Sequence, residues 1–301
     1  MNYSNMIKTE DTASMYHYWS EYRQNLTAYI INGLKEYCRK GSCVAIWGAG
    51  GCNDIEIMEL VKDYKLLLID QDTAKLEQLR ERLGLSMDIC RVVDVGFWKL
   101  SDEDYEMFQA LLMDGASYDE LKLYFQDVIN NMQQPISLEN YSVDCSVVVG
   151  LASQLNARFV ALLHLYKEKL SHIAMEDILG IISNMNQLAV ERLFVSIRQI
   201  TRTLIITGYE SCGCYSIEDM ESYGARLSQA FEEGIYGGSF LSERDTEAAY
   251  IRVAGNEFWH RLIKKALIMD KLEDVGMCRV LNWTFTKEKF YPMLMVTLLV
   301  R

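Results

Sequence analysis

The sequence predicts a doubly wound α/β fold: a mostly parallel sheet with an antiparallel C-terminal hairpin, together with helical insertions. Between positions 43 and 93, short and nearly continuous apolar runs alternate with helical segments, which is typical of parallel strands that helices cover on both faces. Near the C-terminus, the strand-like runs 277–285 and 290–300 are joined by the four residues 286–289. So short a connection cannot cross over between parallel strands, and these runs are expected to form an antiparallel hairpin.

The other elements follow from the spacing of apolar residues. An amphipathic helix is expected over about 13–40, where apolar residues recur at helical spacing and Gly41 ends the pattern. We expect a helical cap over residues 1–40 and one domain over 41–301, with a polar helical insertion at about 96–141. The expected strands are 43–47, 65–69, 88–93, 143–149, 203–207 and 248–253, and the expected helices are 53–62, 73–83, 101–113, 118–132, 153–199 with a break near 171, 217–233 and 257–272.

Composition limits the partners of the chain. Its 301 residues include 30 Lys and Arg against 42 Asp and Glu, a net charge of −12, and no Lys/Arg run is longer than a pair such as Lys264-Lys265. Nucleic acid is not the expected partner, because phosphate binding requires a basic surface. The longest apolar stretch, 293–300, is too short for a bilayer, and the N-terminus lacks the regions of a signal peptide. We expect a cytoplasmic protein without membrane contact, whose oligomeric state the sequence does not indicate.

The eight cysteines lie mostly inside apolar, strand-like runs. Cysteines so placed act as small hydrophobic residues in a reducing compartment, not as a disulfide framework. The close pair Cys212-Gly-Cys214 has no second pair and no nearby histidine. We therefore expect no metal site.

A glycine-rich turn between a strand and a helix is the sharpest functional signal. The segment Val44 to Asp54 reads strand, Gly48-Ala49-Gly50-Gly51, then helix, and glycines there let the backbone approach a bound ligand closely. A second apolar strand ends in Asp70, about twenty residues after the turn, where a carboxylate can accept hydrogen bonds from ribose hydroxyls. This arrangement predicts a nucleoside-binding half-fold.

Two kinds of cofactor use such a half-fold. The dinucleotide fingerprint is incomplete, because its last glycine would fall at Asn53. The segment instead resembles motif I of the class I S-adenosylmethionine (SAM)-dependent methyltransferases, and its Cys-Asn-Asp continuation is similar to a bacterial branch of that family. The run Asp144 to Leu155 resembles motif IV, and the C-terminal hairpin is what this family adds to a Rossmann-like sheet. The resemblance implies SAM as cofactor.

The resemblance also implies roles for individual residues. Asp70 matches the residue that holds the ribose, and Asp94 matches the position near the adenine amino group. Asp54 is not part of that match, but from its place one turn into the expected helix it is expected to reach the methionine amino group. Ile46 departs from the family, which usually has an acidic residue two positions before the first glycine. The expected cofactor-binding residues are Trp47, Gly48, Ala49, Gly50, Asp54, Asp70, Gln71, Asp94, Val95 and Gly150.

The expected function is methyl transfer to a small-molecule or peptide acceptor. No catalytic base is predicted, because the sulfonium of SAM is an activated leaving group and orientation with desolvation supplies much of the rate. Candidates for the acceptor side are Ser153, Gln154, Tyr209 and Glu210, which lie at carboxyl ends of strands. Ser153 has the alternative role of helix cap. An NAD(P)-dependent oxidoreductase and a non-catalytic SAM-binding protein stay open as alternatives, the second because of Ile46.

Overall fold

The core of the protein is a mixed sheet that confirms the predicted fold class. The computed structural model describes residues 16–95, 102–132, 138, 140–155, 157–170, 172–232, 250–251 and 256–301. In this part of the chain the strand order is β3-β2-β1-β4-β5-β9-β6-β7, with β8 also paired to β9. The strands are β1 Cys43–Trp47, β2 Lys65–Asp70, β3 Cys90–Asp94, β4 Val143–Val149, β5 Thr201–Glu210, β6 Gly213–Cys214, β7 Tyr250–Ile251, β8 Leu272–Thr284 and β9 Phe290–Val300.

Strands β3, β2, β1, β4 and β5 are parallel, and β9 runs antiparallel to β5 and to β8. Their side chains alternate between two apolar layers: Ile46 packs with one cluster of buried residues and Trp47 with another. Both faces are buried because helices cover both, which is why the parallel strands read as continuous apolar runs. The predicted Rossmann-like sheet and its C-terminal hairpin are therefore confirmed.

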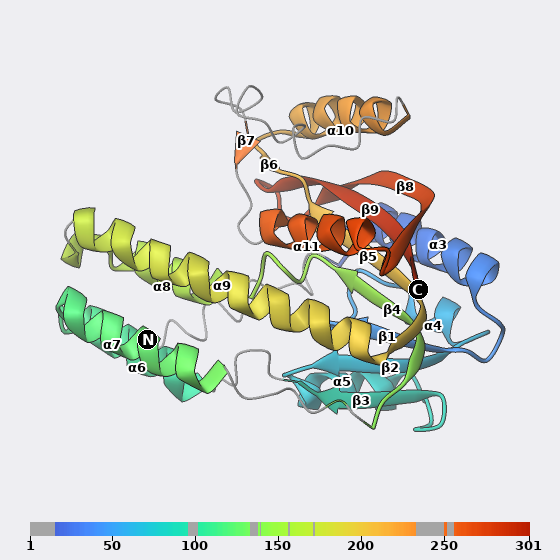
Figure 1. Cartoon of the computed structure of the whole chain (residues 1–301), viewed down its shortest axis with the longest axis horizontal. Helices are drawn as coiled ribbons and strands as arrows, with labels where there is room; N and C mark the ends of the chain where they lie inside the picture. The colour runs from blue at the N-terminus through green and yellow to red at the C-terminus, as the bar shows by residue number, and fades with distance from the viewer. Residues whose placement is uncertain are drawn as a thin grey trace.

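Helices α3, α4 and α5 cover the Ile46 face, and α8, α9 and α11 cover the Trp47 face. Helices α6 and α7 pack on α8 and α9 and extend past the sheet with them (Figure 1). Helix α10 lies against the β8–β9 hairpin. The helices are α3 Ser20–Tyr37, α4 Ile57–Leu60, α5 Thr73–Arg82, α6 Asp102–Met113, α7 Tyr118–Met132, α8 Ala157–Leu165, the 3₁₀ turn Lys167–Lys169, α9 His172–Ile200, α10 Ile217–Glu232 and α11 Asn256–Ile268.

Four elements have the predicted bounds: β1, β4, α7 and β9. The helix expected at 53–62 is reduced to α4, because α3 takes up the backbone groups of its first turn. The Arg23 guanidinium donates to the Asn53 carbonyl at 3.1 Å, and the Glu56 amide donates to Thr27 Oγ1 at 2.9 Å. The predicted helix 53–62 is thus wrong at 53–56 and again at 61–62.

The hairpin begins earlier than predicted. Strand β8 starts at Leu272, where the helix expected at 257–272 was to end, and its pairing with β9 shifts register between Asp274 and Cys278. This irregularity, with Gly276 at a positive φ of 73°, hides the strand from a search for alternating residues. Strand β5 is also longer than the predicted 203–207, since β9 remains paired with it as far as Glu210.

Parts of the predicted insertion, at 96–101 and 133–137, and most of the predicted strand 248–253 lie outside the described residues. Across the described ranges, we find no helix that is both long and apolar enough to cross a bilayer.

Candidate functional site

The glycine turn and Asp70 form one hydrogen-bonded unit at the carboxyl edge of the sheet. Gly48 and Gly50 have positive φ angles of 66° and 52°, a backbone conformation that residues with a side chain rarely adopt. The Gly50 amide donates to Asp70 Oδ2 at 2.8 Å, and the Asp72 amide donates to Asp70 Oδ1 at 3.0 Å. The two features that the sequence analysis connected are therefore in direct contact.

Asp94 lies beside Asp70, because these residues are register partners at the ends of β3 and β2. The Val95 amide donates to the Asp70 carbonyl at 3.2 Å, which holds the chain after β3 next to the turn. Asp94 and Gln71 are exposed and Asp70 is half-buried. The edge therefore presents two adjacent carboxylates, one of them fixed by the backbone.

The side chain of Leu151 occupies the space directly over Gly48. A Cβ on Gly48 would lie 2.6 Å from Leu151 Cδ1, so the glycine is required here by packing as well as by its φ angle. Gly150, also at a positive φ of 63°, aligns β4 with β5 through a 2.9 Å hydrogen bond to the Gly208 carbonyl. A ligand that contacts the Gly48 backbone from this side must displace Leu151 by rotation.

Trp47 and Ala49 are both buried. Trp47 Nε1 donates to Ser146 Oγ at 3.0 Å, so its indole belongs to the core between sheet and helices. Only the backbone of Trp47 faces the carboxyl edge, as expected for a residue that precedes the turn. Ile46 is buried on the opposite face, so no acidic group takes that place.

Next to the turn lies a group of four polar side chains, which we call the polar centre: Tyr22, Glu210 and Trp283, which are buried, and Asp54, which is half-buried. The rings of Tyr22 and Trp283 are stacked, with their centroids 5.0 Å apart. Burial raises the pKa of Asp54 to about 6, while the positive charge of Arg23 acts in the opposite direction. Burial, followed by the negative charges of Asp54 and Glu210, raises the pKa of Tyr22 well above its ordinary value.

Two atoms of the polar centre are buried and have no hydrogen-bond partner among the described residues: the Tyr22 hydroxyl and Trp283 Nε1. Buried groups of this kind are nearly always paired in folded proteins, and an unpaired one suggests a missing ligand or water. The sequence predicts the amphipathic helix that carries Tyr22, but it singles out neither Tyr22 nor Trp283 as part of a site. Neither residue belongs to a sequence motif, so only the tertiary structure identifies them as part of the site.

Helix α3 and the hairpin close over the polar centre. Trp19, at the start of α3, packs on Trp283 and Phe285 and donates from Nε1 to the Phe285 carbonyl at 3.0 Å. Arg23 is 5% exposed, and its Nε lies 2.6 Å from Glu56 Oε1. The first turn of α3 is thereby fastened to both the hairpin and the loop after the glycines.

Of the acceptor-side candidates, the structure brings Ser153 and Glu210 together. Ser153 Oγ donates to Glu210 Oε1 at 2.8 Å, and Glu210 is 4% exposed. Ser153 does not cap α8, which begins at Ala157. Tyr209 faces the other side of the sheet, where its hydroxyl hydrogen-bonds His260 Nδ1 at 2.9 Å, because successive strand residues alternate.

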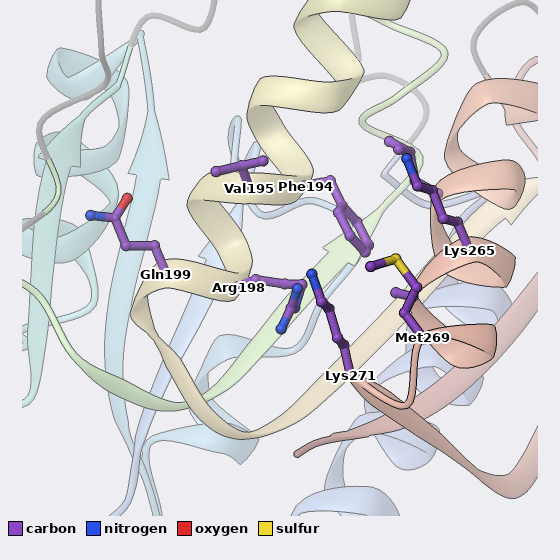
Figure 2. A pocket seen from close by; sticks show the side chains of 9 residues that line it. Phe194, Val195, Arg198, Gln199, Lys265, Met269 and Lys271 are labelled. Carbon is purple, nitrogen blue, oxygen red and sulfur yellow. The ribbon is translucent and has the colours of Figure 1, made fainter.

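Gln154 is exposed at the rim, one residue after Ser153. A cavity of about 370 Å³ lies alongside the glycine turn, and Gly51, Asn53 and Glu56 contribute to its lining. A second cavity lies at the opposite edge of the sheet (Figure 2). No cluster of three or more potential metal ligands is present in the described part of the chain.

No protein-family model and no curated protein matches the sequence. Solved structures similar to this chain include a SAM-dependent methyltransferase from Methanosarcina mazei, with 11% identity, coverage of 89% of this chain and 96% of that one, and a TM-score of 0.43. Another, from Clostridium acetobutylicum, has 11% identity, coverage of 99% and 96%, and a TM-score of 0.42. An N-methyltransferase from Bradyrhizobium japonicum has 11% identity, coverage of 92% and 95%, and a TM-score of 0.41. At such low identities and TM-scores, the fold assignment rests on the strand order itself.

Proposed function

We propose that the chain binds SAM at the carboxyl edge of its sheet and transfers the methyl group to a small-molecule or peptide acceptor. The observation that carries this proposal is the contact between the glycine turn and the Asp70 carboxylate. In doubly wound sheets, ligands bind at the carboxyl ends of the strands. The same contact is the core of a nucleoside site.

The nucleoside half of SAM fits the groups that the edge offers. Each carboxylate oxygen of Asp70 accepts one backbone hydrogen bond and keeps a lone pair for a ribose hydroxyl. Gln71, Asp94 and Val95 extend this edge toward the position proposed for the adenine ring. Gly48, Ala49, Gly50, the Trp47 backbone and Gly150 line the approach from the other side.

The methionine half of SAM fits three members of the polar centre: Asp54, Trp283 and Tyr22. Its ammonium group complements the Asp54 carboxylate, whose raised pKa reflects burial without full charge compensation. Its carboxylate complements Trp283 Nε1 and the Tyr22 hydroxyl, the two buried donors without partners in the described structure. A ligand that pairs such donors recovers desolvation energy of about 1–3 kcal/mol for each. Asp54 then supplies the charge that Ile46 does not.

When bound, SAM supplies an electrophilic methyl group on a sulfonium, which leaves as a neutral thioether. The residues of the chain orient the acceptor, exclude water and remove its proton. We propose that Ser153 and Glu210 contact the acceptor, with Glu210 taking the proton, because this buried carboxylate lies at the edge beside Gly150. We propose Gln154 as a rim contact and leave Tyr209 outside the site.

Calorimetric titration tests the donor site. We expect SAM to bind and NAD not to bind, and Asp70→Ala to weaken SAM binding by at least about tenfold, the value of one charged hydrogen-bonding group. The matched control is Asp144→Ala at the opposite edge, since Asp144 also accepts a backbone hydrogen bond, from Cys43 at 2.9 Å. Binding of NAD but not SAM would favour the oxidoreductase alternative.

Product formation tests catalysis. With a mixture of small amines, hydroxyl compounds and peptides as acceptors, we expect release of S-adenosylhomocysteine above the background of SAM alone. Glu210→Gln is expected to keep SAM binding within about threefold while lowering turnover, because general-base catalysis contributes about 100-fold or more. Tight SAM binding without turnover on any acceptor would favour the non-catalytic alternative.

A further inference from the structure

A pocket of about 460 Å³ lies between α9 and α11, remote from the proposed methyl-donor site. Helix α9 ends at Ile200 and leads directly into the first residue of β5, so this pocket is at the amino edge of the sheet. The glycine turn follows the last residue of β1, at the carboxyl edge. The two sites therefore lie at opposite edges of the sheet.

Three cations line the pocket: Arg198, Lys265 and Lys271. None of its lining residues is acidic, although the chain as a whole has a net charge of −12. The carboxylates that flank Lys271 in sequence are engaged elsewhere, since Asp270 and Glu273 both bind Arg301, at 2.7 and 2.8 Å. The positive charge of the pocket is therefore not compensated from the adjoining loop.

Arg198 gives a second, independent indication of a ligand. Its Nε atom is buried, and within the described ranges it has no hydrogen-bond partner. Figure 2 shows the side chains of Arg198 and Lys271 pointing toward one another from α9 and from the loop before β8. Two like charges that converge repel each other, and an anion between them removes the repulsion and satisfies the buried Nε.

The wall beside these cations is apolar. Phe194 and Ala266 are buried, whereas the Met269 side chain is 51% exposed at the mouth of the pocket. In Figure 2 Phe194 and Met269 lie next to the convergent cations. Apolar groups that line a pocket with a few charged groups are characteristic of small-molecule sites, and the volume falls within their usual range.

We propose that this pocket binds a small amphipathic organic anion, that is, an anionic headgroup on an apolar body. The headgroup lies between Arg198 and Lys271, and the apolar body covers Phe194 and Met269. Bare inorganic phosphate lacks the apolar body and binds weakly. A neutral compound with the same apolar body lacks the headgroup and also binds weakly.

Methyl NMR with ¹³C-labelled methionine provides the test, using octanoate as the probe and 1-octanol and inorganic phosphate as matched comparisons. The Met269 signal is assigned by its loss in Met269→Leu. We expect octanoate to shift this signal saturably, and to bind at least about tenfold more tightly than either comparison compound, as expected for a charged hydrogen bond in a partly apolar site.

Charge-neutralising variants locate the headgroup. Arg198→Gln and the exposed Lys271→Gln are each expected to weaken octanoate binding by about tenfold. The control is Lys264→Gln, which removes the same charge from α11 but does not line the pocket, and it is expected to leave binding within about twofold. Octanoate that binds no better than 1-octanol, or that loses equal affinity in all three variants, would overturn the proposal.

Discussion

Replacing Tyr22 by phenylalanine is expected to stabilise the ligand-free protein, which is unusual for a change at a buried position. The Tyr22 side chain is 3% exposed, and its hydroxyl has no hydrogen-bond partner among the described residues. Leaving a buried polar group unpaired costs about 1–3 kcal/mol. Tyr22→Phe removes that group and keeps the ring that stacks on Trp283, so we expect the free energy of unfolding to rise by about 1 kcal/mol.

Tyr29 provides a matched control on the same helix. It is 4% exposed, but its hydroxyl is paired with Thr297 Oγ1 at 2.9 Å and with the Met277 carbonyl. Tyr29→Phe leaves the Met277 carbonyl without its donor and the Thr297 hydroxyl without its partner, and we expect the free energy of unfolding to fall by about 1–2 kcal/mol. Tyr22 and Tyr29 lie about two helical turns apart on α3. The same substitution at these two positions should therefore change the free energy of unfolding in opposite directions.

Urea unfolding followed by tryptophan fluorescence measures both effects. If the Tyr22 hydroxyl contacts the carboxylate of SAM, saturating SAM should stabilise the wild type more than Tyr22→Phe, because only the wild type recovers the desolvation energy on binding. A loss of stability in ligand-free Tyr22→Phe would refute the view that this hydroxyl is unpaired. Equal stabilisation of both proteins by SAM would remove Tyr22 from the proposed donor site.

Three further predictions concern the same edge of the sheet. Burial raises the pKa of Asp54 from 3.8 to about 6. The stability that this carboxyl contributes is therefore complete below its unfolded pKa and is lost as pH rises through about 6. Urea titrations at several pH values should show that Asp54→Asn loses less stability over that interval than the wild type does. Gly48→Ala should lower stability by about 1–3 kcal/mol, because position 48 has a positive φ and the new Cβ would contact Leu151. Adding Leu151→Ala should relieve the contact but not the backbone strain, and a double-mutant cycle measures the difference. Arg23→Met should destabilise by about 2 kcal/mol because it breaks an ion pair with one buried partner, whereas Arg202→Met, which removes an exposed partner of Asp144, should cost less than about 1 kcal/mol.

Local periodicity was sufficient for the elements whose residues carry one consistent pattern. Strands β1, β4 and β9 and helix α7 have the predicted bounds because each is a continuous apolar or amphipathic run that begins or ends at a polar residue or a glycine. Local periodicity did not predict the bounds of helix α4. Its sequence favours a longer helix, but Arg23 and Thr27 of α3 bind the backbone groups of its first turn.

The candidate site divides in the same way. The glycine turn and Asp70 were predictable, because both lie at carboxyl ends of neighbouring parallel strands and such ends meet at one edge. Trp283 was not, since it lies in the hairpin more than two hundred residues from the turn. Its stacking on Tyr22, and the burial of its Nε1 without a partner in the described part of the chain, arise only once β9 pairs with β5 and carries β8 with it.

The sequence by itself determined the sheet, its hairpin and the contact of a glycine turn with a carboxylate, because these depend on local conformational preference and on the fixed polarity of parallel strands. Tertiary structure alone decided which polar groups are buried without partners among the described residues, in the polar centre at one edge and around Arg198 at the other. Burial and hydrogen bonding are properties of the neighbours that a fold brings together, and in both places those neighbours come from distant parts of the chain.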